Sequence, residues 1–180
     1  STYMNMPWYN TKEGLTVTVT VSEGTATIGV NMFRDAPRLT SVTLPAGVST
    51  IGISAFQGCT MLTSVDLPSV TSIGAYAFNG CQALDGFDMP AGVQTIGAYS
   101  FVNCKKITSL VLPSTLTSIG QNAFQDCDGL TELTFPAGVA VDNNAFTKNK
   151  LASITVTGDT GRDYSVSTAY KNMPWYNAPV

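Results

Sequence analysis

The chain of 180 residues has no histidine, few charged residues and no long apolar run. Without histidine it lacks the commonest metal ligand and the commonest general base near neutral pH, so catalysis is not expected. Charged residues make up only 12 % of the chain and the formal net charge is -3. No basic stripe is therefore available to neutralise phosphates, which argues against nucleic-acid binding.

The apolar runs are too short for a helix that spans a bilayer, so we expect no membrane insertion. No basic segment followed by an apolar segment opens the chain, and we therefore expect a mature protein or a fragment without a signal peptide. The hydrophobic content of 44 % is sufficient for one continuous core.

A repeat of 22 or 23 residues organises the sequence. Three columns of residues recur in phase at this spacing. They are the phenylalanines Phe33, Phe56, Phe78, Phe101, Phe124 and Phe146, the prolines Pro45, Pro68, Pro90, Pro113 and Pro136, and the apolar residues Ile28, Ile51, Ile73, Ile96, Ile119 and Val141. Such a period is typical of a solenoid, in which each unit buries its apolar face against its neighbours.

Each unit predicts two short strands joined by turns. The pattern L-x-x-V-x-L-P, as in 39–45, predicts a strand with Val42 and Leu44 facing inward and a proline at its end. The triplet TSI and its equivalents predict a second short strand on the opposite wall. The alternation over 15–21 predicts an irregular first strand. The Ala-Phe pair and the residues after it predict one helical turn.

A glycine follows the second predicted strand at Gly52, Gly74, Gly97 and Gly120, and Asp142 takes this position later in the chain. Glycine tolerates backbone conformations that other residues avoid, and aspartate is among the few partial substitutes. We therefore expect a sharp turn at this column.

The consensus LTSVxLPxxVTSIGxxAFxxCxxLTSV resembles the BspA-type leucine-rich repeat, a family of bacterial and protist surface proteins. The resemblance extends from about Leu15 to Asn177. It implies a β-rich leucine-rich-repeat solenoid with a right-handed coil, one wall of parallel β-sheet, short second strands and single helical turns. We expect a linker or the tail of a preceding array at 1–14, a solenoid of about five full repeats with partial end repeats at 15–157, and a capping segment at 158–180.

An aromatic segment occurs at both ends of the chain. Residues 3–10 (YMNMPWYN) and 170–177 (YKNMPWYN) match at seven of eight positions. The second copy resembles the aromatic segment that closes such arrays. We interpret the two copies as segments that separate successive repeat arrays, which predicts a monomeric module of a longer chain. The aromatic residues of both copies either cap the end of a core or contact a ligand: Trp8, Tyr9, Trp175 and Tyr176.

The four cysteines, Cys59, Cys81, Cys104 and Cys127, share one column. In a stacked array their positions lie about 5 Å apart, so the sulfurs form a line instead of the tetrahedron that zinc requires. Parallel side chains at this spacing also exceed the usual distance for a disulfide. Buried free thiols are therefore expected, with disulfides and a metal as the alternatives, and we expect no cofactor.

The outward columns of the first strand form a candidate partner-binding face. Its side chains are mostly small and polar, without the Trp, Tyr and Arg anchors typical of binding hot spots, so binding there would be shallow. A solvated surface is the alternative. The residues are Ser41, Thr43, Ser64, Asp66, Asp88, Ser109, Val111, Glu132 and Thr134.

Asp66 and Asp88 fall in one of these columns, at a spacing similar to that of a retaining glycosidase pair. No pocket is predicted around them, and catalytic carboxylates need a site that excludes water. We expect a solvated acidic patch, with a weak cation site as the alternative.

The expected function is non-catalytic. The residues predict a flat polar surface, and the family resemblance implies adhesion to a protein or glycan of a host or neighbouring cell, at an extracellular or cell-surface location. The alternatives are a structural spacer in a larger surface protein and an accessory domain of an extracellular enzyme.

Overall fold

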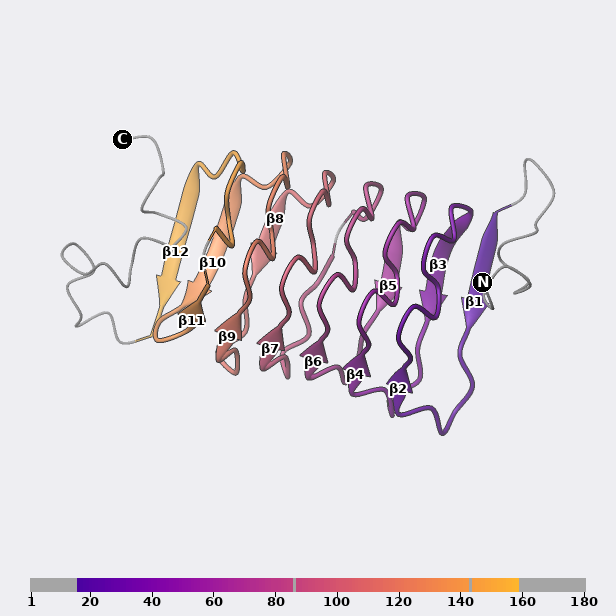
Figure 1. Cartoon of the computed structure of the whole chain (residues 1–180). Coiled ribbons are helices and arrows are strands. Elements are labelled where there is room, and N and C mark those ends of the chain that lie inside the picture. Colours follow the sequence, from indigo (N-terminus) through magenta and orange to yellow (C-terminus); the bar gives the residue numbers. More distant parts are fainter. Residues whose placement is uncertain (1–15, 86, 143, 159–180) are drawn as a thin grey trace.

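The computed structural model describes residues 16–85, 87–142 and 144–158. They form an elongated parallel β-solenoid of stacked coils (Figure 1). We number the coils by their phenylalanines, from coil one to coil six: Phe33, Phe56, Phe78, Phe101, Phe124 and Phe146. The predicted solenoid is thus confirmed. The expected linker 1–14 and nearly all of the expected capping segment 158–180, with Trp8, Tyr9, Trp175 and Tyr176, lie outside the described residues.

One wall is a continuous six-stranded parallel sheet made from strands of two residues each. Equivalent residues of neighbouring coils pair with each other, and the sheet order is β11-β9-β7-β6-β4-β2. The first residue of each strand is polar or small and the second is apolar and faces the core. The predicted second strand is therefore confirmed in every coil: β2 (Thr27–Ile28), β4 (Thr50–Ile51), β6 (Ser72–Ile73), β7 (Thr95–Ile96), β9 (Ser118–Ile119) and β11 (Ala140–Val141).

The opposite wall is interrupted in coil three. It consists of two three-stranded parallel sheets, with orders β1-β3-β5 and β12-β10-β8. The described residues of segment 84–90, which lies between β5 and β8, form no strand, so the expectation of a strand in this unit is wrong. The strands are β1 (Val17–Thr20), β3 (Leu39–Thr43), β5 (Ser64–Asp66), β8 (Ser109–Val111), β10 (Glu132–Pro136) and β12 (Ser153–Thr157).

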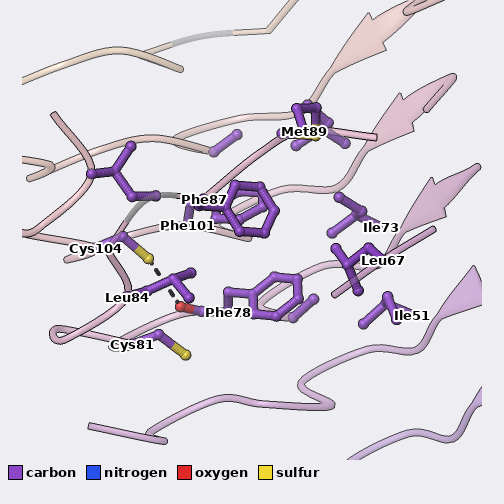
Figure 2. Packing of buried hydrophobic residues seen from close by; sticks show 14 of the residues in the cluster. Ile51, Leu67, Ile73, Phe78, Cys81, Leu84, Phe87, Met89, Phe101 and Cys104 are labelled. Carbon is purple, nitrogen blue, oxygen red and sulfur yellow. Dashed lines mark hydrogen bonds between the residues drawn. The ribbon is translucent and has the colours of Figure 1, made fainter. Parts of the chain in front are cut away.

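The bulk of one side chain accounts for this interruption. Phe87 occupies the inward column that holds Val42 in coil one and Val65 in coil two. Its buried ring packs against Phe78 and Phe101 at centroid distances of 5.8 and 5.0 Å, tilted by 57° and 58° (Figure 2). A phenyl ring in a valine position needs extra volume, and a well-packed core supplies volume through backbone displacement. The main chain of coil three therefore leaves the strand register.

The phenylalanine column forms the centre of the core. Consecutive rings of the six coils stack with centroids 5.1 or 5.2 Å apart and interplanar angles between 6° and 16°. Five of the six rings are at most 1 % exposed and Phe146 is 8 % exposed. Burial of each ring contributes about 1.5–3 kcal/mol, and stacking adds about 0.5–1.5 kcal/mol.

A ladder of turns runs along the solenoid at this column and replaces the expected helical turns. Each coil has two residues with positive φ, four positions apart, such as Ser54 (54°) and Gly58 (74°) in coil two. The backbone between these two residues directs every second N–H group toward the next coil. Those of Ser54, Phe56 and Gly58 donate to main-chain carbonyls of coil three at 2.9, 2.7 and 2.8 Å. Because these groups bond between coils, no helix forms in the part of the chain that the structure describes.

The four cysteines are free and buried, as predicted. Each Sγ donates a hydrogen bond to the phenylalanine carbonyl of the preceding coil, over 3.0 Å for Cys59, 3.2 Å for Cys81, 3.3 Å for Cys104 and 3.1 Å for Cys127. Burial raises the pKa of Cys59 and Cys127 to about 12 and raises the pKa of the other two well above 9.0. The thiols are therefore neutral donors inside the core.

The glycine column has a different cause from the sharp turn that we expected. None of the four glycines has a positive φ. A Cβ atom on Gly97 would instead lie 2.4 Å from the main-chain nitrogen of Ala75 in the preceding coil, and the other three would have main-chain contacts of 2.5 to 2.9 Å. Gly29 holds the same position in coil one, where a Cβ atom would meet nothing within 4 Å. Close approach of two main chains therefore selects glycine here.

We predict that Gly97→Ala lowers the free energy of unfolding by about 1–3 kcal/mol, because the methyl group would overlap the main chain of coil three. Gly29→Ala is the matched control and should change stability by less than about 0.5 kcal/mol. Urea unfolding followed by circular dichroism measures both. Equal losses in the two variants would contradict the close-approach explanation.

The buried thiols predict a stability that falls at alkaline pH. Since their folded pKa values are raised above the ordinary value of 9.0, the unfolded chain releases these protons first as the pH rises. The contribution of Cys59 and Cys127 is complete below pH 9 and is lost between pH 9 and about 12. Chemical unfolding at a series of pH values measures the fall, which should be shallower in Cys104→Ala. An identical slope in parent and variant would count against this account.

Candidate partner-binding face

The interrupted wall places all nine residues of the candidate face on the outside of the solenoid. They come from β3, β5, β8, β10 and segment 84–90, because alternate residues of a strand point to opposite sides. Two of them, Ser41 and Thr134, are half-buried. The remaining seven are exposed: Thr43, Ser64, Asp66, Asp88, Ser109, Val111 and Glu132.

The parallel register sorts these side chains into columns. Ser41 pairs with Ser64 and Thr43 pairs with Asp66 across β3 and β5. Ser109 pairs with Glu132, and Val111 with Thr134, across β8 and β10. Side chains in one column therefore stand about 4.8 Å apart along the solenoid. A ligand with a short repeat along this axis would meet the same contacts in successive coils.

Two shallow hollows flank the displaced segment of coil three. The first has a volume of about 420 Å³ and lies over β3 and β5, with Asp66 and Asp88 in its lining. The second has a volume of about 360 Å³ and lies between this segment and β8, where Asp85, Asp88 and Val111 line it. Both hollows are open and lined by exposed carboxylates, so neither is a pocket that excludes water.

The carboxylates of the face line these hollows without closing a site. Asp66 and Asp88 line the first hollow together, and Asp85 joins Asp88 in the second. All three side chains are exposed. The described residues contain no group of three or more His, Cys, Asp or Glu that could hold a metal ion. The arrangement offers hydrogen-bond acceptors to a partner that rests on the surface.

The sequence reasoning missed a second group of exposed side chains. Tyr76 and Tyr99 lie on the turn ladder, where their rings stack with centroids 5.0 Å apart and an interplanar angle of 5°. The signal was present in the sequence, because other coils have asparagine or serine at this position.

No helix in the described part of the chain is long and apolar enough to cross a membrane.

Comparison with protein families matches the BspA type leucine-rich repeat region, in six copies over residues 26–152. Curated proteins give no significant match. Among solved structures, the chain is similar to a leucine-rich repeat protein of T. pallidum, with 27 % identity and a TM-score of 0.68. That similarity covers 78 % of this chain and 69 % of the T. pallidum protein.

Two further structures are longer than this chain. One is a leucine-rich cell surface protein from Faecalibacterium prausnitzii, with 29 % identity, a TM-score of 0.60, and coverage of 77 % of this chain and 47 % of that protein. The other is a leucine-rich repeat protein from Bacteroides ovatus, with 26 % identity, a TM-score of 0.64, and coverage of 80 % and 44 %. The chain therefore spans less than half the length of these two relatives.

Proposed function

Because the chain belongs to the BspA-type leucine-rich repeat family, we propose that it is a non-catalytic binding module that attaches to a protein or glycan of a host or neighbouring cell. Binding would use the candidate face on β3, β5, β8 and β10. The observation that carries this proposal is the in-register array of exposed polar side chains around two open hollows.

The chemistry of the face supports weak and multiple contacts. Its hydroxyls and carboxylates offer many hydrogen-bonding groups, and Val111, 61 % exposed, adds an apolar contact beside the second hollow. Few large anchors are present, so a single face would bind weakly. Several modules on one chain or one cell would raise the avidity without any new contact.

An extracellular or cell-surface location is part of the proposal. Its support is the similarity to a protein described as a leucine-rich cell surface protein. Neutral surface side chains and an acidic composition, with a pI near 4.7, are compatible with this location.

We predict that beads coated with the purified chain attach to fixed epithelial or bacterial cells, and that Asp88→Arg with Val111→Arg lowers attachment at least about tenfold. The substitutions remove a hydrogen-bond acceptor at Asp88 and an apolar contact at Val111. The arginines that replace them add bulk and positive charge against the same partner. Ser22→Arg with Glu23→Arg, at two exposed positions outside the face, changes the net charge by the same amount and should attach normally. Attachment that persists in the double variant, or that the parent chain lacks, would contradict the proposal.

We also propose that 158–180 caps the C-terminal end of the solenoid. The support is the partial exposure of apolar residues on coil six: Val141, Leu151, Ile154 and Val156. An aromatic residue from the following segment would cover such a surface.

Trp175→Ala should then lower the melting temperature by several degrees, because an apolar contact would be lost. Differential scanning calorimetry measures the shift, and Trp175→Phe should recover part of it. An unchanged melt together with weaker attachment in the bead assay would assign Trp175 to ligand contact instead.

A further inference from the structure

A ridge of exposed or half-buried apolar side chains crosses the first four coils on the turn ladder, next to the six-stranded sheet. Tyr76 of coil three is 37 % exposed and stacks on Tyr99 of coil four, which is half-buried. One position earlier in the turn, Ile53 of coil two is 51 % exposed and Val30 of coil one is 54 % exposed. We call these four residues the tyrosine ridge.

Both tyrosines have a backbone conformation that does not favour them. Each has a φ of 58°, in the left-handed region, where bulky residues are outliers and asparagine is tolerated. The same column follows this preference in the other coils, where it holds Asn31, Ser54, Asn122 and Asn144. The fold therefore accepts asparagine or serine at this position, and stability alone does not explain why coils three and four have tyrosine. Strain of this kind concentrates at functional positions.

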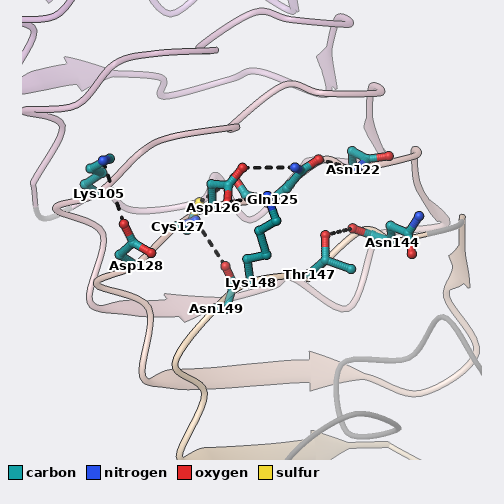
Figure 3. A network of polar contacts seen from close by, with 10 residues as sticks. All are labelled: Lys105, Asn122, Gln125, Asp126, Cys127, Asp128, Asn144, Thr147, Lys148 and Asn149. Atoms are coloured by element: carbon teal, nitrogen blue, oxygen red, sulfur yellow. Dashed lines mark hydrogen bonds and ion pairs between the residues drawn. The ribbon is translucent and has the colours of Figure 1, made fainter.

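The surroundings of the tyrosine pair are polar but uncharged. The turn segments of coils two, three and four (52–59, 74–81 and 97–104) contain no charged residue. Charges return only in the outer coils, where Arg34 pairs with Asp35 at 3.4 Å and Lys148 pairs with Asp126 at 3.4 Å (Figure 3). The half-buried polar side chains along the ladder are mostly carboxamides: Gln57, Asn79, Asn103, Asn122 and Gln125.

A third hollow, of about 320 Å³, opens on the six-stranded sheet next to this region. Its lining includes Gly97, two residues before Tyr99, and the hydroxyl residues Thr95 and Ser118. Asp142, in the lining from coil six, brings a carboxylate acceptor. Hydrogen-bonding groups and a concave surface therefore begin within two residues of the stacked rings.

We propose that the tyrosine ridge and this hollow bind a neutral glycan chain. Aromatic rings pack against the C–H faces of sugars, and carboxamides and hydroxyls exchange hydrogen bonds with sugar hydroxyls. Tyr76 is 37 % exposed, so part of its side chain is accessible to such a ligand. An anionic polymer would require cations, which the turn segments of these coils lack. This surface is separate from the candidate face, so the proposal does not depend on it.

The test uses the full chain and a panel of soluble hexasaccharides from β-1,4-glucan, β-1,4-xylan, β-1,4-mannan and α-1,4-glucan. Calorimetric titration should detect binding of at least one sugar by the parent chain. Tyr76→Asn with Tyr99→Asn should weaken that binding at least about tenfold, since both rings are removed. The same variant should melt at or above the parent temperature, because asparagine accepts the left-handed conformation.

Two control variants are needed. One distinguishes the role of the rings from that of the backbone conformation, and the other distinguishes this surface from the candidate face. Tyr76→Phe with Tyr99→Phe keeps the stack and should retain most of the affinity. Asp88→Arg with Val111→Arg alters only the candidate face and should bind the sugar like the parent. Failure of every sugar to bind the parent, or equal binding by the asparagine variant, would overturn the proposal. So would an asparagine variant that melts well below the parent, because the tyrosines would then serve stability.

Discussion

Register between coils is the constraint on which the rest of the structure depends. Each coil leaves its main-chain N–H and C=O groups to be paired by the next, and unpaired groups in the interior are costly. The two repeat lengths do not disturb this pairing. Thr43 pairs with Asp66, 23 residues later, while Thr50 pairs with Ser72, 22 residues later, so the missing residue falls in the loop between the walls. The change in repeat length is therefore confined to this loop, which lies outside the sheets of both walls.

The periodic sequence was sufficient to predict most of the features that repeat. The core column of phenylalanines, the two-residue strands and the buried thiols all follow from one residue type at one spacing, because stacking converts sequence period into spatial columns. The glycine column was recognised but its cause was not. Glycine is required at Gly97 by the main chain of a different coil, and a contact between coils has no signature in the local sequence.

One feature that sequence reasoning missed does not repeat, and another repeats in every coil. Phe87 is apolar like the valines and leucines of its column, so the hydrophobic pattern remained intact while the volume changed. The consequence of the larger ring depends on its neighbours in the core, because Phe87 packs against Phe78 and Phe101. The turn ladder was likewise mistaken for a helical turn, because a short apolar segment does not reveal whether its hydrogen bonds run within a coil or between coils.

The turn ladder also gives the solenoid a direction that the composition does not reveal. In the parallel sheets, hydrogen bonds between coils run both ways, but in the ladder the N–H groups of each coil point toward the next coil and the carbonyls point back, as between Phe56 and Ala77. Peptide dipoles aligned in one sense add together, as they do in a helix. The turn ladder therefore has a dipole whose partly positive end lies at coil six and whose partly negative end lies at coil one. The ladders of two modules joined end to end would meet with opposite poles.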